Sequence, residues 1–239
     1  MIDWQVLALA ARRANSAYIE DAAQSKAAFE ALGDVWIDIH ADSSHQAVLS
    51  VDQTGATHLS ISGTRASAGK LLDVYADVSL DAAPVNGGTV TAGVVEGMQT
   101  LWDWVLSTVP DANPISVCGH SLGAARTHLV PLFLPASRIG MLHSFAAPKF
   151  IGADFYATYH DQLANMVCVL NAADGWASWP WISEEWCHRP PLEHVWLKDD
   201  AGAYSMVLGD LWPGGWCFQN HSMDEYQARI EAAAHSAAA

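Results

Sequence analysis

Positive charge is scarce in this sequence. Lys and Arg together number 11 in 239 residues, against 26 Asp and Glu, which gives a formal net charge of −15. Charged residues make up 15% of the chain, where about 25% is usual in a soluble domain. The basic residues are scattered, and binding to nucleic acid needs clustered Lys and Arg to neutralise phosphates. The composition therefore argues against nucleic acid as a partner and against tight adsorption to an anionic membrane.

Long apolar runs are also missing. No segment approaches the roughly 18 apolar residues of a membrane-spanning helix, so we expect no stable insertion into a membrane. The N-terminus does not resemble a signal peptide, because Asp3 stands where a basic residue is usual and the arginines follow the apolar run. On this ground we expect a cytoplasmic protein, with signal-independent export as the alternative.

Cysteine is infrequent and its spacing forms no recognisable pattern. The four residues are Cys118, Cys168, Cys187 and Cys217, and none forms a Cys-x-x-Cys pair. Without an export signal, reduced thiols are favoured over disulfides. The eleven histidines form no His-x-x-x-His pair, and we expect no metal site.

Apolar residues, by contrast, make up 51% of the chain, and at this length they suit one domain with a sizeable core. Strands are predicted at 45–52, 57–63, 115–118, 138–148 and 165–174, with a hairpin at 193–208, and helices at 4–31, 92–108, 122–130, 152–163 and from 223 onward. Strands that alternate with helices predict an α/β fold with a mostly parallel central sheet flanked by helices. We expect a single domain over residues 1–239, with a tryptophan-rich excursion at 176–216 that contains the hairpin.

The segment Gly-His-Ser-Leu-Gly at 119–123 lies where a predicted strand ends and a predicted helix begins. A serine becomes a useful nucleophile only when a neighbouring base takes its proton. Glycines on both sides let the strand and helix approach closely, and the helix N-terminus favours an incipient oxyanion. The pattern predicts a nucleophile elbow with Ser121 as the nucleophile and the backbone N–H of Leu122 as one donor of an oxyanion hole.

Several blocks along the chain, in the same order, resemble the class 3 (fungal-type) lipase family. They are "LALAARRANSAY", "ISGTRASAGKLLDVYADV", "GHSLGAARTHL", "SFAAPKFIGADFYATY", "LNAADGWASWP" and "NHSMDEY", and together they span nearly the whole chain. The resemblance implies an α/β-hydrolase fold, a Ser-Asp-His triad in that order along the chain, and hydrolysis of carboxylic esters without a metal or an organic cofactor.

The acid and the base of the triad are assigned by this resemblance. Asp174 follows a predicted buried strand and matches the family's Asn-x-x-Asp before an apolar-Pro step, although an Asp that merely starts a turn is the alternative. His221 matches the family's late His-x-x-x-Tyr block, with Tyr226 displaced from the usual spacing. Its rival His194 lies in a block that resembles a strand where the histidine packs. We expect His120, beside the nucleophile, to point the other way in the elbow and to be a structural hydrogen-bonding residue.

The second oxyanion donor and the substrate-binding wall are less sharply defined. "SISGTR" resembles the family's Arg-Gly-Ser/Thr and implies Thr64 as the donor, although a strand-end turn is the alternative and Ser62 replaces the usual preceding residue. The segment at 66–80 stands where many relatives have a lid, but it is short and acidic. Trp176 and Trp179 follow the predicted acid and are candidates for substrate binding, with filling of the core as the alternative.

Together these residues predict a serine carboxylic-ester hydrolase, a lipase or esterase that acts through an acyl-enzyme on a neutral lipid or a small acyl ester. A phospholipase, a feruloyl or acetyl esterase, or a thioesterase on the same triad is the nearest alternative. A lipid-binding module without activity is the alternative from another class. The sequence carries no sign of the oligomeric state.

Overall fold

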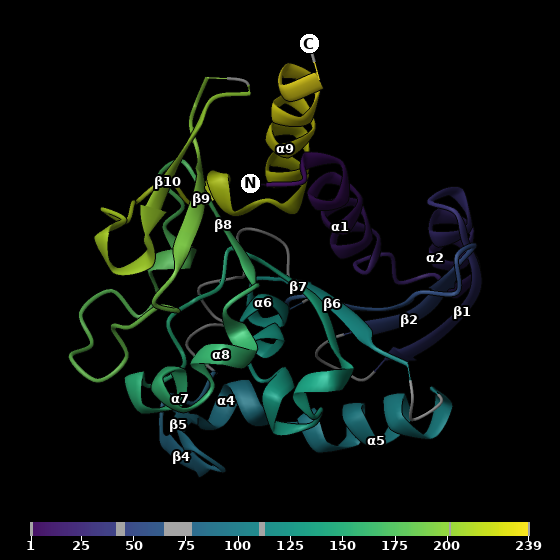
Figure 1. Ribbon diagram of the computed structural model, residues 1–239. Coiled ribbons are helices and arrows are strands. Elements are labelled where there is room, and N and C mark those ends of the chain that lie inside the picture. The colour runs from purple at the N-terminus through teal and green to yellow at the C-terminus, as the bar shows by residue number, and fades with distance from the viewer. Residues whose placement is uncertain (1, 42–45, 65–77, 110–112, 201, 239) are drawn as a thin grey trace.

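The computed structural model describes residues 2–41, 46–64, 78–109, 113–200 and 202–238. An eight-stranded sheet crosses the molecule in the order β1-β2-β3-β6-β7-β8-β9-β10 (Figure 1). Its strands are β1 (Asp34–Ala41), β2 (Gln46–Asp52), β3 (Thr57–Ile61), β6 (Ile115–His120), β7 (Ile139–Phe145), β8 (Val167–Asn171), β9 (Glu193–Leu197) and β10 (Tyr204–Leu208). A separate hairpin joins β4 (Ala82–Val85) to β5 (Gly88–Thr91).

The centre of the sheet is parallel and its edges are antiparallel. Strands β3, β6, β7, β8 and β9 pair in parallel, while β1 with β2, β2 with β3, and β9 with β10 pair antiparallel. Parallel strands need helical crossovers and are covered on both faces, which suits the apolar runs that form the central strands here. The prediction of an α/β fold with a mostly parallel central sheet is confirmed.

Helices cover both faces of the sheet. They are α1 (Trp4–Ser16), α2 (Ala22–Ala31), α4 (Ala92–Val95), α5 (Met98–Thr108), α6 (Leu122–Thr127), α7 (Ala153–Thr158), α8 (His160–Leu163) and α9 (Met223–Ala238). Helices α1 and α9 pack on each other and against one face, and α5, α6 and α7 contribute to a second buried cluster on the other face (Figure 1). Neighbouring residues of β6 pack in different clusters. Val117 packs in the cluster that includes α5, α6 and α7, and Cys118 packs in the cluster that includes α1 and α9.

The structure corrects two helix predictions. The helix predicted at 4–31 is two helices, because the chain turns after Ala17 and Asp21 caps α2 by accepting a hydrogen bond from the N–H of Gln24. The helix predicted at 92–108 is divided at Gly97, which adopts a left-handed conformation with φ of 74° that glycine tolerates without strain.

Two sets of strands were not predicted. Strand β1 is partly exposed along most of its length, as an edge strand can be, and its sequence "DVWIDIHA" lacks a clean apolar alternation. The short β4–β5 hairpin lies outside the main sheet. The hairpin predicted at 193–208 is confirmed as β9 and β10.

All four cysteines are free thiols in the structure. In the described part of the chain, no helix has both the length and the apolar character that crossing a membrane requires.

Candidate active site

Ser121 lies at a sharp turn between β6 and α6. Its φ of 58° is unusual for a residue with a side chain, and such strain is typical of functional turns. The turn is tight because the helix start packs directly on the strands. A Cβ on Gly119 would collide with the carbonyl oxygen of Gly123, and one on Gly123 would collide with that of Ile61. The local geometry is that of the predicted elbow.

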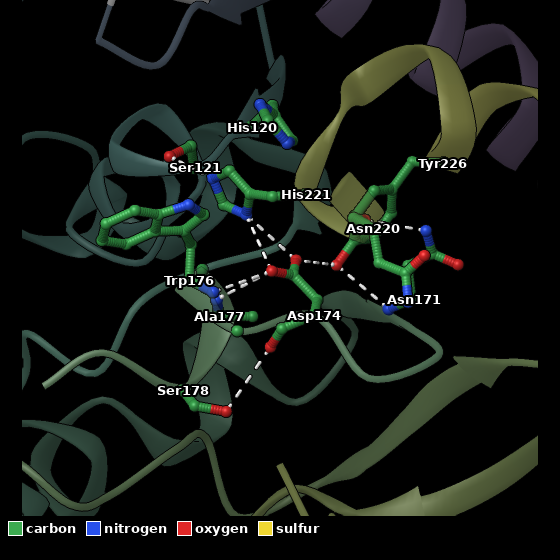
Figure 2. Close-up of polar contacts among 12 residues, drawn as sticks. His120, Ser121, Asn171, Asp174, Trp176, Ala177, Ser178, Asn220, His221 and Tyr226 are labelled. Carbon is green, nitrogen blue, oxygen red and sulfur yellow. Dashed lines mark hydrogen bonds and ion pairs between the residues drawn. The ribbon is translucent and has the colours of Figure 1, made fainter. Parts of the chain in front are cut away.

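Three side chains from distant parts of the chain meet at this turn. The Ser121 Oγ lies 2.8 Å from Nε2 of His221, and the His221 Nδ1 lies 3.0 and 3.1 Å from the two carboxylate oxygens of Asp174. Asp174 follows β8, and His221 ends a short 3-10 turn just before α9. All three residues are buried, and Figure 2 shows the carboxylate of Asp174 facing the imidazole ring of His221.

The Asp174 carboxylate is held by further hydrogen bonds. Its Oδ1 accepts from the backbone N–H groups of Trp176 at 2.9 Å and Ala177 at 3.2 Å, and its Oδ2 accepts from the Tyr226 hydroxyl at 2.8 Å. Donors of this kind fix the orientation of a carboxylate. The carboxylate therefore presents both oxygens to the imidazole in one geometry.

Tyr226 is a residue whose role the sequence reasoning missed. Burial raises the pKa of its phenol well above the ordinary value, and the charge of Asp174 adds to the effect, so the hydroxyl keeps its proton and can donate. The same oxygen accepts the N–H of Asn171 at 3.0 Å. The available signal was the "NHSMDEY" block itself, in which the tyrosine follows the histidine by five positions and lies on the first turns of α9.

His120 lies against the imidazole of His221, with 4.8 Å between the ring centres. Its Nδ1 lies 2.6 Å from the Tyr18 hydroxyl, which also accepts the N–H of Gly63 at 2.9 Å. Burial lowers the pKa of His120 well below its ordinary value, and the neighbouring His221 adds to the effect, so the ring is neutral. His120 is hydrogen-bonded as expected, but it does not point away from the site, because its ring lies against His221 and lines the same cavity as Ser121.

The rival histidine lies elsewhere. His194 is on β9, and its Nδ1 lies 3.0 Å from the carbonyl oxygen of Leu192. Burial lowers the pKa of His194 to about 3, and the charge of Arg189 contributes. Its position agrees with the packing role that the sequence indicated.

A cavity of about 590 Å³ opens over Ser121. The described residues that line it are Asn15, Tyr18, Thr64, His120, Ser121, Phe218, Gln219, His221, Ser222, Met223, Asp224 and Glu225. Thr64 thus reaches the same space as the serine, and its buried hydroxyl has no hydrogen-bond partner among the described residues. Leu122 is the first residue of α6, where backbone N–H groups lack partners within the helix. The assignment of Thr64 and Leu122 as oxyanion donors stays a prediction.

The two tryptophans predicted to bind substrate are packed among other aromatic rings. Trp176 is buried, and its ring centre lies 5.0 Å from that of Phe218. The ring centre of Trp179 lies 4.6 Å from that of Trp181. Neither is among the described residues that line the cavity over Ser121, whereas Phe218 is. A substrate-binding role for Trp176 and Trp179 stays a prediction.

Two further predictions concern the lid and a metal site. Residues 65–77 hold most of the segment compared with a lid, and they lie outside the described residues. In the described ranges, no three His, Cys, Asp or Glu side chains are grouped so as to hold a metal ion.

The sequence model of the family described as lipase (class 3) matches residues 58–183, just over half of the 239. A search of curated proteins finds no match. Similar solved structures include a variant of MDLA from Penicillium cyclopium (17% identity, 97% of this chain and 99% of that chain, TM-score 0.74). They also include lipase II from Rhizopus niveus (15%, 91% and 92%, 0.71) and the mono- and diacylglycerol lipase from Aspergillus oryzae (14%, 96% and 96%, 0.70).

At these identities the solved structures establish the α/β-hydrolase fold, and the match of the family model establishes the family. The chain belongs to the class 3 lipase family and is an ester hydrolase of the lipase type.

Proposed function

We propose that the protein hydrolyses neutral carboxylic esters through an acyl-enzyme formed on Ser121. The observation that carries the proposal is the chain of hydrogen bonds from Ser121 through His221 to Asp174, at the base of a cavity large enough for a substrate.

The proposed first step is acylation. The Ser121 oxygen attacks the ester carbonyl carbon while Nε2 of His221 takes the hydroxyl proton, which gives a tetrahedral intermediate. The negative charge on its oxygen is stabilised by the backbone N–H groups of Leu122 and Thr64 and by the Thr64 hydroxyl. The intermediate collapses, the bond to the alcohol breaks, and the alcohol leaves with the proton from His221.

Deacylation repeats the same steps with water. His221 takes a proton from the water molecule, the hydroxide oxygen bonds to the acyl carbon, and the second tetrahedral intermediate expels Ser121, which regains its proton. The carboxylic acid is released. Throughout, Asp174 keeps the imidazole oriented and stabilises the imidazolium that forms twice in each cycle.

The walls of the cavity support a neutral substrate. Asp224 and Glu225 place two carboxylates on one side, and the whole chain is strongly acidic, so a negatively charged substrate is disfavoured. Phe218 and Met223 supply apolar contacts. These features favour a neutral lipid or a small acyl ester over a phospholipid with an anionic headgroup.

The central experiment is turnover of p-nitrophenyl butyrate by the Ser121→Ala variant. We expect kcat to fall by about 10⁵-fold, because members of a triad act as a unit. Ser205→Ala is the matched control, since Ser205 lies on β10 and is not among the described residues that line this cavity. Wild-type rates in a folded Ser121→Ala protein would refute the proposal, and a wild-type serine that no fluorophosphonate labels would favour the inactive binding module.

The acyl preference is measured with p-nitrophenyl esters from acetate to palmitate, each assayed below and above the concentration at which it forms aggregates. A rise in rate at the onset of aggregation indicates a lipase. A preference for short chains with no such rise indicates an esterase. Phospholipid, feruloyl and thioester substrates assayed in parallel separate the remaining alternatives.

A further inference from the structure

A second cavity, of about 230 Å³, lies beside the tryptophan-rich segment. Most of its lining comes from residues 178–216, and it shares no described lining residue with the cavity over Ser121. It is smaller than the roughly 300–1,000 Å³ of pockets that hold drug-sized ligands, so its occupant would be small. The mechanism proposed above leaves this cavity without a role.

Three indole rings form apolar walls of this second cavity. They belong to Trp181, Trp212 and Trp216. Trp216 is 69% exposed, an unusual state for so large an apolar side chain. The ring centres of Trp181 and Trp216 are 5.5 Å apart. A ligand with an alkyl or aromatic body would cover these rings and remove apolar surface from water.

Two cations line the same cavity, although the chain has only 11 Lys and Arg. Lys149 is partly buried, and its ammonium makes no hydrogen bond or ion pair with the part of the chain that the structure describes. Burial lowers the pKa of Lys149, and the nearby positive charge of Arg189 adds to the effect. The more distant charge of Asp210 opposes this shift only in part, so the ammonium lacks a directly bonded partner to offset the loss of its hydration.

The guanidinium of Arg189 already has hydrogen-bond partners within the protein. Its two terminal nitrogens donate to the carbonyl oxygens of Ala147 and Ala177, and its guanidinium lies 5.0 Å from the ring centre of Trp212. Its hydrogen bonds are therefore structural, and its contribution to a ligand is its charge. Lys149 is the cation with donors to offer.

One carboxylate limits the charge that the ligand can carry. Asp210 lines the second cavity, where its Oδ1 accepts the backbone N–H of Arg189 at 3.0 Å and its Oδ2 lies 4.0 Å from Nδ1 of His188. Two cations and one anion leave a single excess positive charge on the walls. A monoanion matches this balance, whereas a dianion such as sulfate would leave an excess negative charge beside Asp210.

We propose that the second cavity binds a small monocarboxylate, with the carboxylate paired to Lys149 and its apolar body packed on Trp181 and Trp216. Acids of this class are the products of the proposed ester hydrolysis. That source of the ligand rests on the proposed function, but the binding itself does not.

The test is calorimetric titration of the full-length protein with sodium hexanoate. Hexan-1-ol serves as the uncharged probe and inorganic sulfate as the dianionic one. We expect hexanoate to bind at least about tenfold more tightly than either, which is the usual scale for a charge-assisted hydrogen bond. Hexanol or sulfate binding as tightly as hexanoate would overturn the proposal.

Substitutions test whether hexanoate binds in the second cavity. Lys149→Met keeps the length of the side chain and removes its charge, and we expect it to weaken hexanoate binding at least about tenfold. The matched control is Lys26→Met, because Lys26 lies on the surface 3.9 Å from Glu30, and it should leave binding unchanged. The ammonium of Lys149 makes no bond within the described structure, so the melting temperature should hold.

Trp216→Ala provides a second variant at an exposed position, and it should weaken hexanoate binding several-fold by removing one apolar wall. Hexanoate binding that persists in both Lys149→Met and Trp216→Ala would assign the ligand to another site, such as the cavity over Ser121, and overturn the proposal. Ester turnover by the same samples separates the two proposals. Wild-type protein that binds hexanoate through Lys149 but hydrolyses no ester would contradict the proposed function alone.

Discussion

At the scale of single residues, the carboxylate of Asp174 is the most constrained group of the candidate site. Each of its oxygens accepts at least two hydrogen bonds, and one of the donors is the phenol of Tyr226. A carboxylate held in this way cannot rotate without breaking several charge-assisted bonds at once. The orientation of His221 thus depends on residues that do not touch the cavity.

Tyr226→Phe tests this dependence. Removal of the hydroxyl leaves Asp174 with one donor fewer, and we expect kcat to fall about tenfold while KM stays unchanged, because Tyr226 does not line the cavity over Ser121. Tyr159→Phe is the control, since the Tyr159 hydroxyl donates to the carbonyl oxygen of Asn86 away from this site. A larger KM with unchanged kcat would contradict the positioning role.

The residues that could be predicted from the sequence are those whose motifs are local. Ser121 lies between two glycines, and Asp174 and His221 each belong to a short block that resembles the lipase family, so the three could be proposed to act together. Tyr18 and Phe218 could not be assigned, because their roles arise only when distant segments pack together. Tyr18 reaches His120 across 102 positions of the chain.

At the scale of elements, the elbow depends on how closely α6 approaches β3. The backbone of Gly123 lies so near the carbonyl groups of Ile61 and Ser62 that no side chain fits between them. This contact fixes the start of the helix, and with it Ser121 and the N–H of Leu122, relative to the end of the strand that leads to Thr64.

Gly123→Ala should therefore destabilise the protein by about 3 kcal/mol or more, because the added methyl group meets backbone atoms that cannot move aside cheaply. The control is Gly33→Ala, where a Cβ would meet no atom within 4 Å but φ is +96°. We expect that variant to lose only about 1–2 kcal/mol, the cost of a left-handed residue with a side chain. Urea denaturation of both proteins measures the difference, and equal losses would show that the contact is not tight.

The elements that could be predicted were those with a strong apolar signal, such as β6, β8 and the β9–β10 hairpin. The division between α1 and α2 could not be predicted, because the residues between them retain an apolar spacing compatible with one long helix. Tertiary contacts place the break between the two helices, because Tyr18 lies in it and the Tyr18 hydroxyl hydrogen-bonds to His120 and to the N–H of Gly63.

At the scale of the whole molecule, the buried histidines couple stability to pH. Burial lowers the pKa of His128 to about 3, of His143 to about 4 and of His194 to about 3, from an ordinary value of 6.5. Between pH 6.5 and about 4, the unfolded chain binds protons at these positions that the native protein does not bind. These histidines therefore have no effect on stability above pH 6.5, and they destabilise the native protein progressively as the pH falls below it.

We expect the free energy of unfolding to decrease below pH 6.5 by about 1.4 kcal/mol per pH unit for each of these histidines. Denaturant titrations between pH 8 and pH 4.5 measure the slope. His143→Gln should reduce the slope by about one histidine's share, since its uncharged amide takes up no proton in the unfolded chain. An unchanged slope in that variant would show that His143 titrates alike in both states.

The packing of α9 on α1 has a consequence for how activity would fail under stress. His221 lies directly before α9, which packs on α1. Two hydrogen bonds join these helices, one from Arg12 Nε to Glu231 Oε1 at 2.7 Å and one from Asn15 Nδ2 to Asp224 Oδ1 at 2.8 Å. Local opening of this helix pair withdraws the proposed base while the central strands stay intact and the serine keeps its place. The contact between α1 and α9 is then the part of the proposed machinery that opens first, so we expect inactivation to precede global melting and to be reversed when the two helices pack together again.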